Sequence, residues 1–149
     1  LLAYPHLRPI ILQHDVVNFA PLERPIKLGP GQLLKVPGIS GDAIFGEEAY
    51  FVRLQDILTQ NIVGVAASSA GFTCHHLFFE EHQTVFAQGV ACASFHPVDT
   101  QVPGPLNLDG LHRAFPPVAQ GAWAYGTHAY RTLTRAQAAM LLSMRKLRR

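Results

Sequence analysis

The chain has 149 residues and a mass of 16.3 kDa, which is the size of a single domain. Apolar residues make up 48% of it and charged residues 15%, a composition that excludes intrinsic disorder as the ground state. No apolar run approaches the length of a membrane-spanning helix, and two cysteines are too few for a disulfide scaffold.

The charge is unevenly distributed along the chain. Residues 131–149 contain six basic side chains and no acid, a net charge of +6. Residues 1–130 hold the other six basic side chains and all ten acids, a net charge of −4. A basic end of this kind suits nucleic acid, an acidic membrane surface or another subunit.

The first half of the chain is predicted to form short strands. Prolines recur through residues 1–28 and exclude a long helix there. Apolar β-formers then alternate with Gly-Pro turns. We expect strands at residues 7–12, 24–28, 32–36, 49–54 and 62–65, with a helical turn at 56–58.

The clearest strand prediction covers Phe72–Glu81, where side chains alternate with period two. Both faces of this segment are largely apolar, which favours a central strand. Cys74 and His76 would share one of its faces. Further strands are expected at 83–87 and 90–95, separated by Gly89.

The last third combines a predicted loop with a predicted helix. Residues 97–128 are rich in Pro and Gly and are expected to form a long surface loop. Thr134 and Gln137 fit a capping box, and apolar residues recur at helical spacing after it. We therefore predict a mainly β protein with a β-rich body at 1–130 and a basic C-terminal α-helix within 131–149.

Five segments, in order, carry motifs of one known family. The strongest is His76–Gly89, HLFFEEHQTVFAQG, which is similar to a pattern H-L-L-x-(acidic)-x-H-x-V-V-F-A-x-G. The chain resembles the Hint (hedgehog/intein) domain, in the bacterial branch often found in extracellular proteins of alphaproteobacteria. The other matching segments are Arg24–Leu33, Phe45–Val52, Ala93–Phe95 and Thr132–Leu142.

The resemblance implies a fold and a chemistry. The family's fold is a twisted all-β horseshoe, and its location is extracellular or at the cell surface. Its activity is an acyl rearrangement in which a first-position Cys or Ser attacks the preceding carbonyl. A Thr/Ser-x-x-His element assists this N-to-S shift, and a later histidine assists resolution.

The sequence departs from the family where that chemistry resides. It opens on Leu1 rather than on a nucleophile, and Val36-Pro37-Gly38-Ile39 stands where the family has Ser-Pro-x-His. His82 alone matches a family histidine, and a C-terminal His-Asn pair is missing. These departures predict a degenerate copy that has lost autoprocessing and acts as a structural or protein-interaction module in a larger assembly.

Two other functions stay open at this point. The chain could be a self-processing domain whose nucleophile segment lies upstream of Leu1. It could also be a nucleic-acid-binding adaptor that uses the basic tail, in which case its binding would collapse with salt. No cofactor is expected for any of the three.

Each candidate site residue has a structural explanation beside the functional one. His82 is a candidate general acid or base, but a turn histidine bonded to backbone is the commoner case. Cys74 and His76, joined by His82 or Cys92, are a candidate zinc site. Cysteine buried as a small hydrophobe is the default alternative.

The candidate partner-binding residues lie in the last third of the chain. Trp123 and Tyr125, between glycines, are candidate anchors for a partner, or else they fasten the loop to its own body. The cationic candidates, which would otherwise complement the helix dipole, are Arg145, Lys146, Arg148 and Arg149.

Overall fold

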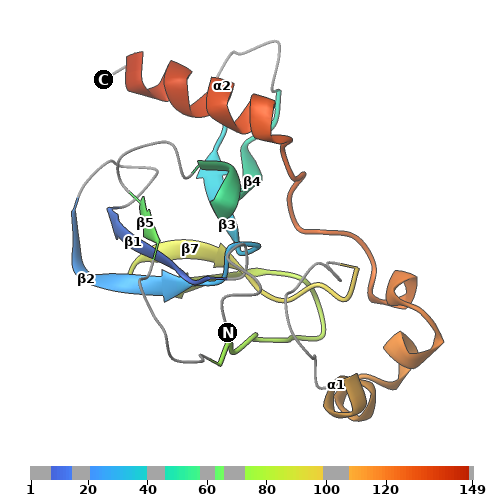
Figure 1. The fold of residues 1–149 in the computed structure, drawn as a ribbon. Helices are drawn as coiled ribbons and strands as arrows, with labels where there is room; N and C mark the ends of the chain where they lie inside the picture. The colour runs from blue at the N-terminus through green and yellow to red at the C-terminus, as the bar shows by residue number, and fades with distance from the viewer. Residues whose placement is uncertain are drawn as a thin grey trace.

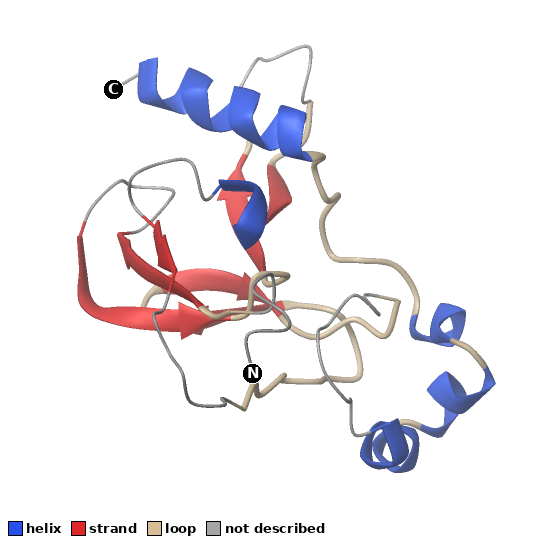
Figure 2. Ribbon diagram, viewed as in Figure 1, coloured by secondary structure: helices blue, strands red, loops and turns tan. Residues whose placement is uncertain are grey.

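The computed structural model describes residues 8–14, 21–39, 46–57, 63–65, 73–98 and 108–147. Within these ranges the strands form two antiparallel sheets (Figures 1 and 2). The first sheet has the order β2-β1-β5, built from Pro21–Leu28, Ile10–His14 and Val63–Val65. The second has the order β4-β3-β7-β6, built from Ala49–Arg53, Leu33–Pro37, Val90–Ala93 and Thr84–Ala87.

Local sequence explains where the strands run and turn. β2 contains Pro25 and lies at the edge of its sheet, where a missing backbone N–H leaves no ladder bond unmade. Between β6 and β7, Gln88 and Gly89 have φ values of 50° and 80°. Two central residues with positive φ are the geometry of a tight hairpin turn, and Gly89 adopts it without steric strain.

The two sheets and the C-terminal helix share one hydrophobic core. The first sheet contributes Ile10 and Leu12, and the second contributes Leu34, Val36, Tyr50, Val52, Val90 and Cys92. Helix α2, Arg135–Leu147, adds Ala138, Leu141 and Leu142 to the same cluster. The short 3-10 helix η2, Leu54–Ile57, adds its buried Leu54 and Ile57.

The predicted capping box at the start of α2 is confirmed. The Gln137 backbone N–H donates to Thr134 Oγ1 at 3.3 Å, and the Thr134 N–H donates to Gln137 Oε1 at 3.0 Å. Near the other end of the helix, Arg145 Nη1 donates to the Pro37 carbonyl oxygen at 3.0 Å. The helix is therefore held to the body by a hydrogen bond near its C-terminal end as well as through its buried face.

The predicted loop at 97–128 is partly wrong, because its second half is helical. Helix α1 covers Leu108–Ala114 and is followed by two 3-10 helices, η3 at Pro116–Gln120 and η4 at Ala122–Tyr125. Figures 1 and 2 show these elements gathered at one side of the sheets, and we call residues 108–125 the helical lobe. Proline at the first positions of η3 suits a helix start, so the Pro-rich composition was compatible with short helices.

The predicted central strand at 72–81 is also wrong. Phe72 lies outside the described residues, and residues 73–79 belong to no strand. Both neighbours of β7 are already taken, by β3 and β6, so the sheet leaves no central place for this segment. Of its apolar side chains, Phe78 contacts the rings of Phe115 and Tyr125 in the helical lobe, whereas Leu77 is 58% exposed.

The fold class is mainly β with a C-terminal α-helix, as the sequence predicted. Of the helices in the described ranges, none has both the length and the apolarity to cross a bilayer.

Candidate functional site: a buried histidine cluster

The candidate site lies on the face of the second sheet that points away from the main core. Alternation along β3, β4 and β7 places Leu33, Phe51 and Ala93 on this face, where they form a second, smaller buried cluster. Phe51 is fully buried although it lies outside the main core. Its ring makes T-shaped contacts with the rings of His82 and Tyr130, each at a centroid distance of 5.4 Å.

His82 is held by the backbone at both ring nitrogens. The Ala129 N–H donates to Nδ1 at 3.0 Å, and Nε2 lies 3.1 Å from the carbonyl oxygen of Ser94. Because an N–H can only donate, Nδ1 must carry a lone pair, and Nε2 must carry the proton given to Ser94. The ring is 8% exposed, so this geometry fixes a buried, neutral imidazole in one tautomer.

His96 repeats this arrangement with other backbone groups. The Val98 N–H donates to its Nδ1 at 3.1 Å, and its Nε2 lies 3.2 Å from the Gly126 carbonyl oxygen. The same reasoning fixes a neutral ring with the proton on Nε2. The side chain is 1% exposed, which makes it one of the most deeply buried polar groups in the described part of the chain.

His128 completes the cluster from the segment that joins the helical lobe to α2. Its ring stacks on His96 with a centroid distance of 4.0 Å and an interplanar angle of 14°. His82 meets both of the other histidines edge-on, at 5.2 and 5.1 Å. Side chains separated by up to 46 residues thus share one aromatic cluster.

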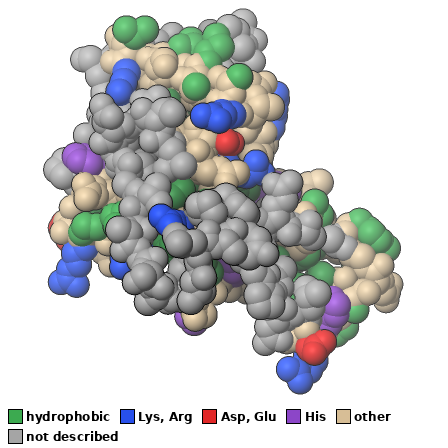
Figure 3. Space-filling view, in the orientation of Figure 1, with side chains coloured by type: hydrophobic (Ala, Val, Ile, Leu, Met, Phe, Trp, Pro, Cys, Tyr) green, Lys and Arg blue, Asp and Glu red, His purple; other side chains and the backbone are tan. Residues whose placement is uncertain are grey.

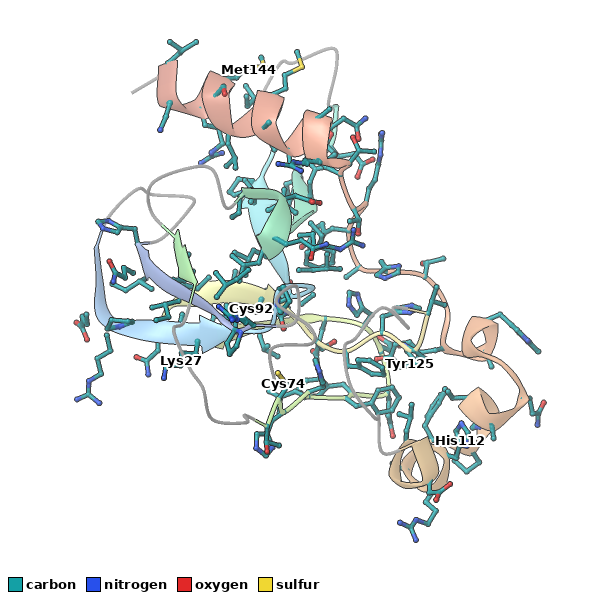
Figure 4. The ribbon with its side chains drawn as sticks, in the orientation of Figure 1. Lys27, Cys74, Cys92, His112, Tyr125 and Met144 are labelled. Carbon is teal, nitrogen blue, oxygen red and sulfur yellow. The ribbon has the colours of Figure 1, made fainter. Side chains whose placement is uncertain are left out.

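Tyr125 closes the cluster on the side of the helical lobe (Figure 4). Its ring meets His96 edge-on at 5.1 Å, and its hydroxyl donates to the Phe79 carbonyl oxygen at 2.8 Å. Burial raises the pKa of this tyrosine above its ordinary value, so the hydroxyl stays protonated and keeps donating. Tyr125 is therefore buried, a position that suits the alternative in which it fastens its segment to the body of the protein.

A lysine and a tyrosine lie beside Phe51. Lys35, on β3, donates from Nζ to the Tyr130 hydroxyl at 2.7 Å, and its Nζ also lies 4.3 Å from that ring's centroid. Tyr130 in turn meets Phe51 edge-on. Two aromatic rings, Tyr130 and Phe51, thus lie between this cation and His82.

The arrangement favours scaffolding over proton transfer. A general base needs a ring nitrogen that can reach a substrate proton, and both nitrogens of His82 and of His96 are engaged with backbone groups. Acid–base work at either ring would require breaking a buried hydrogen bond. The bonded turn histidine, which was the structural explanation for His82, matches this geometry.

The residues suggested for zinc do not come together. No group of three or more His, Cys, Asp or Glu side chains in the described ranges is placed to hold a metal ion. Cys74 is exposed and Cys92 is buried, and both are free thiols. His76 lies against the Phe95 ring at 5.5 Å, and burial followed by the nearby His75 lowers its pKa.

The suggested partner-binding residues occupy different environments. Trp123 is 74% exposed on the helical lobe, and its indole lies over Gly121, which has a φ of 152° and no Cβ to obstruct the ring. Arg145 is bonded to Pro37, and Lys146 is exposed near the end of α2. Arg148 and Arg149 lie outside the described residues. On the face drawn in Figure 3, Lys and Arg side chains are spread rather than gathered into one patch.

Sequence reasoning identified His82 but missed His96 and His128. The signal for His82 was its place in a family motif. His96 and His128 join it only through the tertiary fold, because they follow His82 by 14 and 46 residues and lie outside any helix or strand that His82 belongs to. No local pattern could have grouped them.

The comparisons with known proteins give one match. A family model described as Hint domain matches residues 1–99, which is about two thirds of the chain and includes His82 and His96. Neither the curated proteins nor the solved structures contain a match to this sequence. The family match agrees with the motifs and with the mainly β fold, and the chain belongs to the Hint domain family.

Proposed function

We propose that this chain is a non-catalytic Hint domain that serves as a structural or protein-interaction module within a larger assembly. The observation that carries the proposal is the state of His82, the histidine that matches the family. Both of its ring nitrogens bond to backbone groups, and its ring packs between Phe51 and two other histidines. Such a ring stabilises the fold and presents no free nitrogen to a reacting amide.

The position of the family's other histidine supports the same proposal. Ile39 stands at the end of the segment that resembles Ser-Pro-x-His, and its side chain belongs to the main hydrophobic core with 7% exposure. Val36, at the start of that segment, is fully buried in the same core. A core-packing role has replaced a polar one at both ends of the element.

The backbone between these two residues is tied into the sheet. The Gly38 N–H donates to the Glu48 carbonyl oxygen at 2.8 Å, and the carbonyl of Glu47 occupies the space that a Cβ at residue 38 would need. The segment therefore closes the connection between β3 and β4. Its backbone and the side chains at both of its ends are engaged in the fold.

The experiment compares this proposal with the self-processing alternative. The natural protein, with whatever precedes Leu1, is purified and incubated with a thiol and with hydroxylamine, which cleave thioesters and esters. The proposal predicts one unchanged intact mass. A shorter product that accumulates with either nucleophile would overturn it, provided that the product is lost in His82→Gln and retained in the matched variant His75→Gln.

The interaction role is tested at Trp123, which offers a rigid, exposed aromatic surface. A photoreactive phenylalanine analogue is placed at residue 123 of the natural full-length protein, and a second sample carries it at exposed Gln120 of the same lobe. The proposal predicts a crosslink to another domain or chain from residue 123 and much less from residue 120. Equal yields from both positions would contradict a defined contact at Trp123.

A further inference from the structure

We infer that His82 and His96 form a pH-sensitive latch, which holds the helical lobe and residues 126–129 against the second sheet and releases them on acidification. This inference goes beyond the proposed function, since it concerns a conformational device and not a partner or a reaction. It rests on the hydrogen bonds of the two rings and on their burial.

The latch is located where the lobe meets the body. His82 accepts from the Ala129 N–H, and His96 donates to the Gly126 carbonyl, so both ends of residues 126–129 are bonded to histidine rings. The lobe itself contacts the body through Tyr125, whose hydroxyl reaches Phe79. Phe78 adds ring contacts with Phe115 and Tyr125.

Protonation is incompatible with this arrangement at the atomic level. A proton added to His82 Nδ1 would point at the Ala129 N–H, so that two donors would face each other where one hydrogen bond existed. The same conflict arises between His96 Nδ1 and the Val98 N–H. Each ring can take up a proton only after its backbone donor has moved away.

Burial and neighbouring charge act in the same direction. Both rings are at least nine-tenths buried, and an imidazolium there would lose its hydration. The ring centroids of the two histidines lie 5.2 Å apart, and His128 is stacked on His96, so a second positive charge would meet the first at close range.

The described residues bring other titratable groups to the border of the cluster. Lys35 brings a positive charge to Tyr130, beside Phe51, and His76 lies against the ring of Phe95, which precedes His96 in the chain. Tyr125 and Tyr130 are neutral when protonated. Among the described residues, Glu81 is an acid close enough to act on Tyr125, and its exposure to solvent weakens its attraction for a buried cation.

The size of the expected effect follows from proton linkage. A released histidine titrates near its ordinary value of about 6.5. Between pH 7.5 and pH 5, each ring that binds a proton only when released raises the opening constant roughly 30-fold, and two rings raise it roughly 1,000-fold. The opening reaction should therefore take up close to two protons below pH 6.

Amide hydrogen exchange tests the latch on the full chain. The opening constants of the Ala129 and Val98 amides, corrected for the intrinsic pH dependence of exchange, are measured from pH 7.5 to pH 5. We expect them to rise by two to three orders of magnitude, while the amides of β3 and β4 keep their protection. An opening constant that stays flat would overturn the inference, and so would an equal rise in β3 and β4, which would indicate global unfolding.

Substitution identifies the responsible rings. Glutamine carries one donor and one acceptor and does not titrate, so His82→Gln should reduce the proton uptake from about two to about one. His75→Gln is the matched control at an exposed histidine and should leave the uptake at two. An unchanged uptake in folded His82→Gln would refute the role of His82. The mass experiment on the natural protein is independent of this outcome.

Discussion

Helix α2 is predicted to be an integral part of the β body, and Leu141→Ala tests this most sharply. Leu141 is fully buried in the cluster that also contains Leu34, Val36 and Tyr50. Truncating a buried leucine to alanine removes its transfer free energy and leaves a cavity, which together destabilise a protein by about 2–5 kcal/mol. We therefore expect a loss of about 3 kcal/mol in the free energy of unfolding.

The measurement is urea unfolding followed both by far-UV circular dichroism and by fluorescence of Trp123. With a slope of about 1–3 kcal/mol/M, this loss lowers the midpoint by roughly 1–3 M. Met140→Ala is the matched control, since Met140 precedes Leu141 in the same helix and is 43% exposed. Similar midpoints for the two variants, or a separate early transition for α2, would show that the helix does not share the core of the β body.

Three further predictions concern single groups. Burial raises the pKa of Cys92 to about 11, so iodoacetamide at pH 8 should alkylate the exposed Cys74 of the native protein far faster than the buried Cys92. Equal alkylation rates of the two cysteines, measured by peptide mass mapping, would contradict this. Thr134→Ala removes the capping bond and should reduce stability by about 1 kcal/mol in urea, whereas no change would show that the cap is unimportant. Partial desolvation and then the nearby His75 lower the pKa of His76, so its contribution to stability is complete above about pH 6.5 and is lost as the pH falls. An NMR midpoint at or above the ordinary value would contradict this.

The strands and α2 could be predicted because their signals are local. The strands at 33–37, 49–53, 84–87 and 90–93 lie within the predicted segments or exceed them by one residue. The capping box at Thr134 has the same character, since its partners are three residues apart. Alternation, turn residues and caps act over a few positions, so a single sequence contains them.

At residues 72–81 the local alternation of side chains predicted a strand that the described residues, 73–81, do not form. The alternation was real, but a strand also needs an edge to pair with, and β3 and β6 already flank β7. The helices of the helical lobe could not be predicted because their local signal is too weak. Helix α1 has only 7 residues, too few to establish a helical period. In both cases tertiary context decided the outcome.

The candidate site was the least predictable part of the molecule. His82 could be found through its motif, but its role depends on Ala129, 47 residues away, and on Ser94. Which backbone group meets a ring nitrogen is set by the packing of the lobe on the sheet. A sequence can therefore indicate a histidine of interest without showing whether its nitrogens are free.

The most direct test of the central claim is the protonation state of the His82 ring. Long-range proton–nitrogen correlation spectra of the labelled chain at pH 7.5 distinguish the two neutral tautomers from each other and from imidazolium. We expect a single neutral form with the proton on Nε2. This proton should exchange slowly with solvent, because the hydrogen bonds of the ring to Ala129 and Ser94 are intact. Fast averaging of the two tautomers, or an imidazolium at this pH, would show that His82 is free to move protons and would contradict both its structural role and the latch.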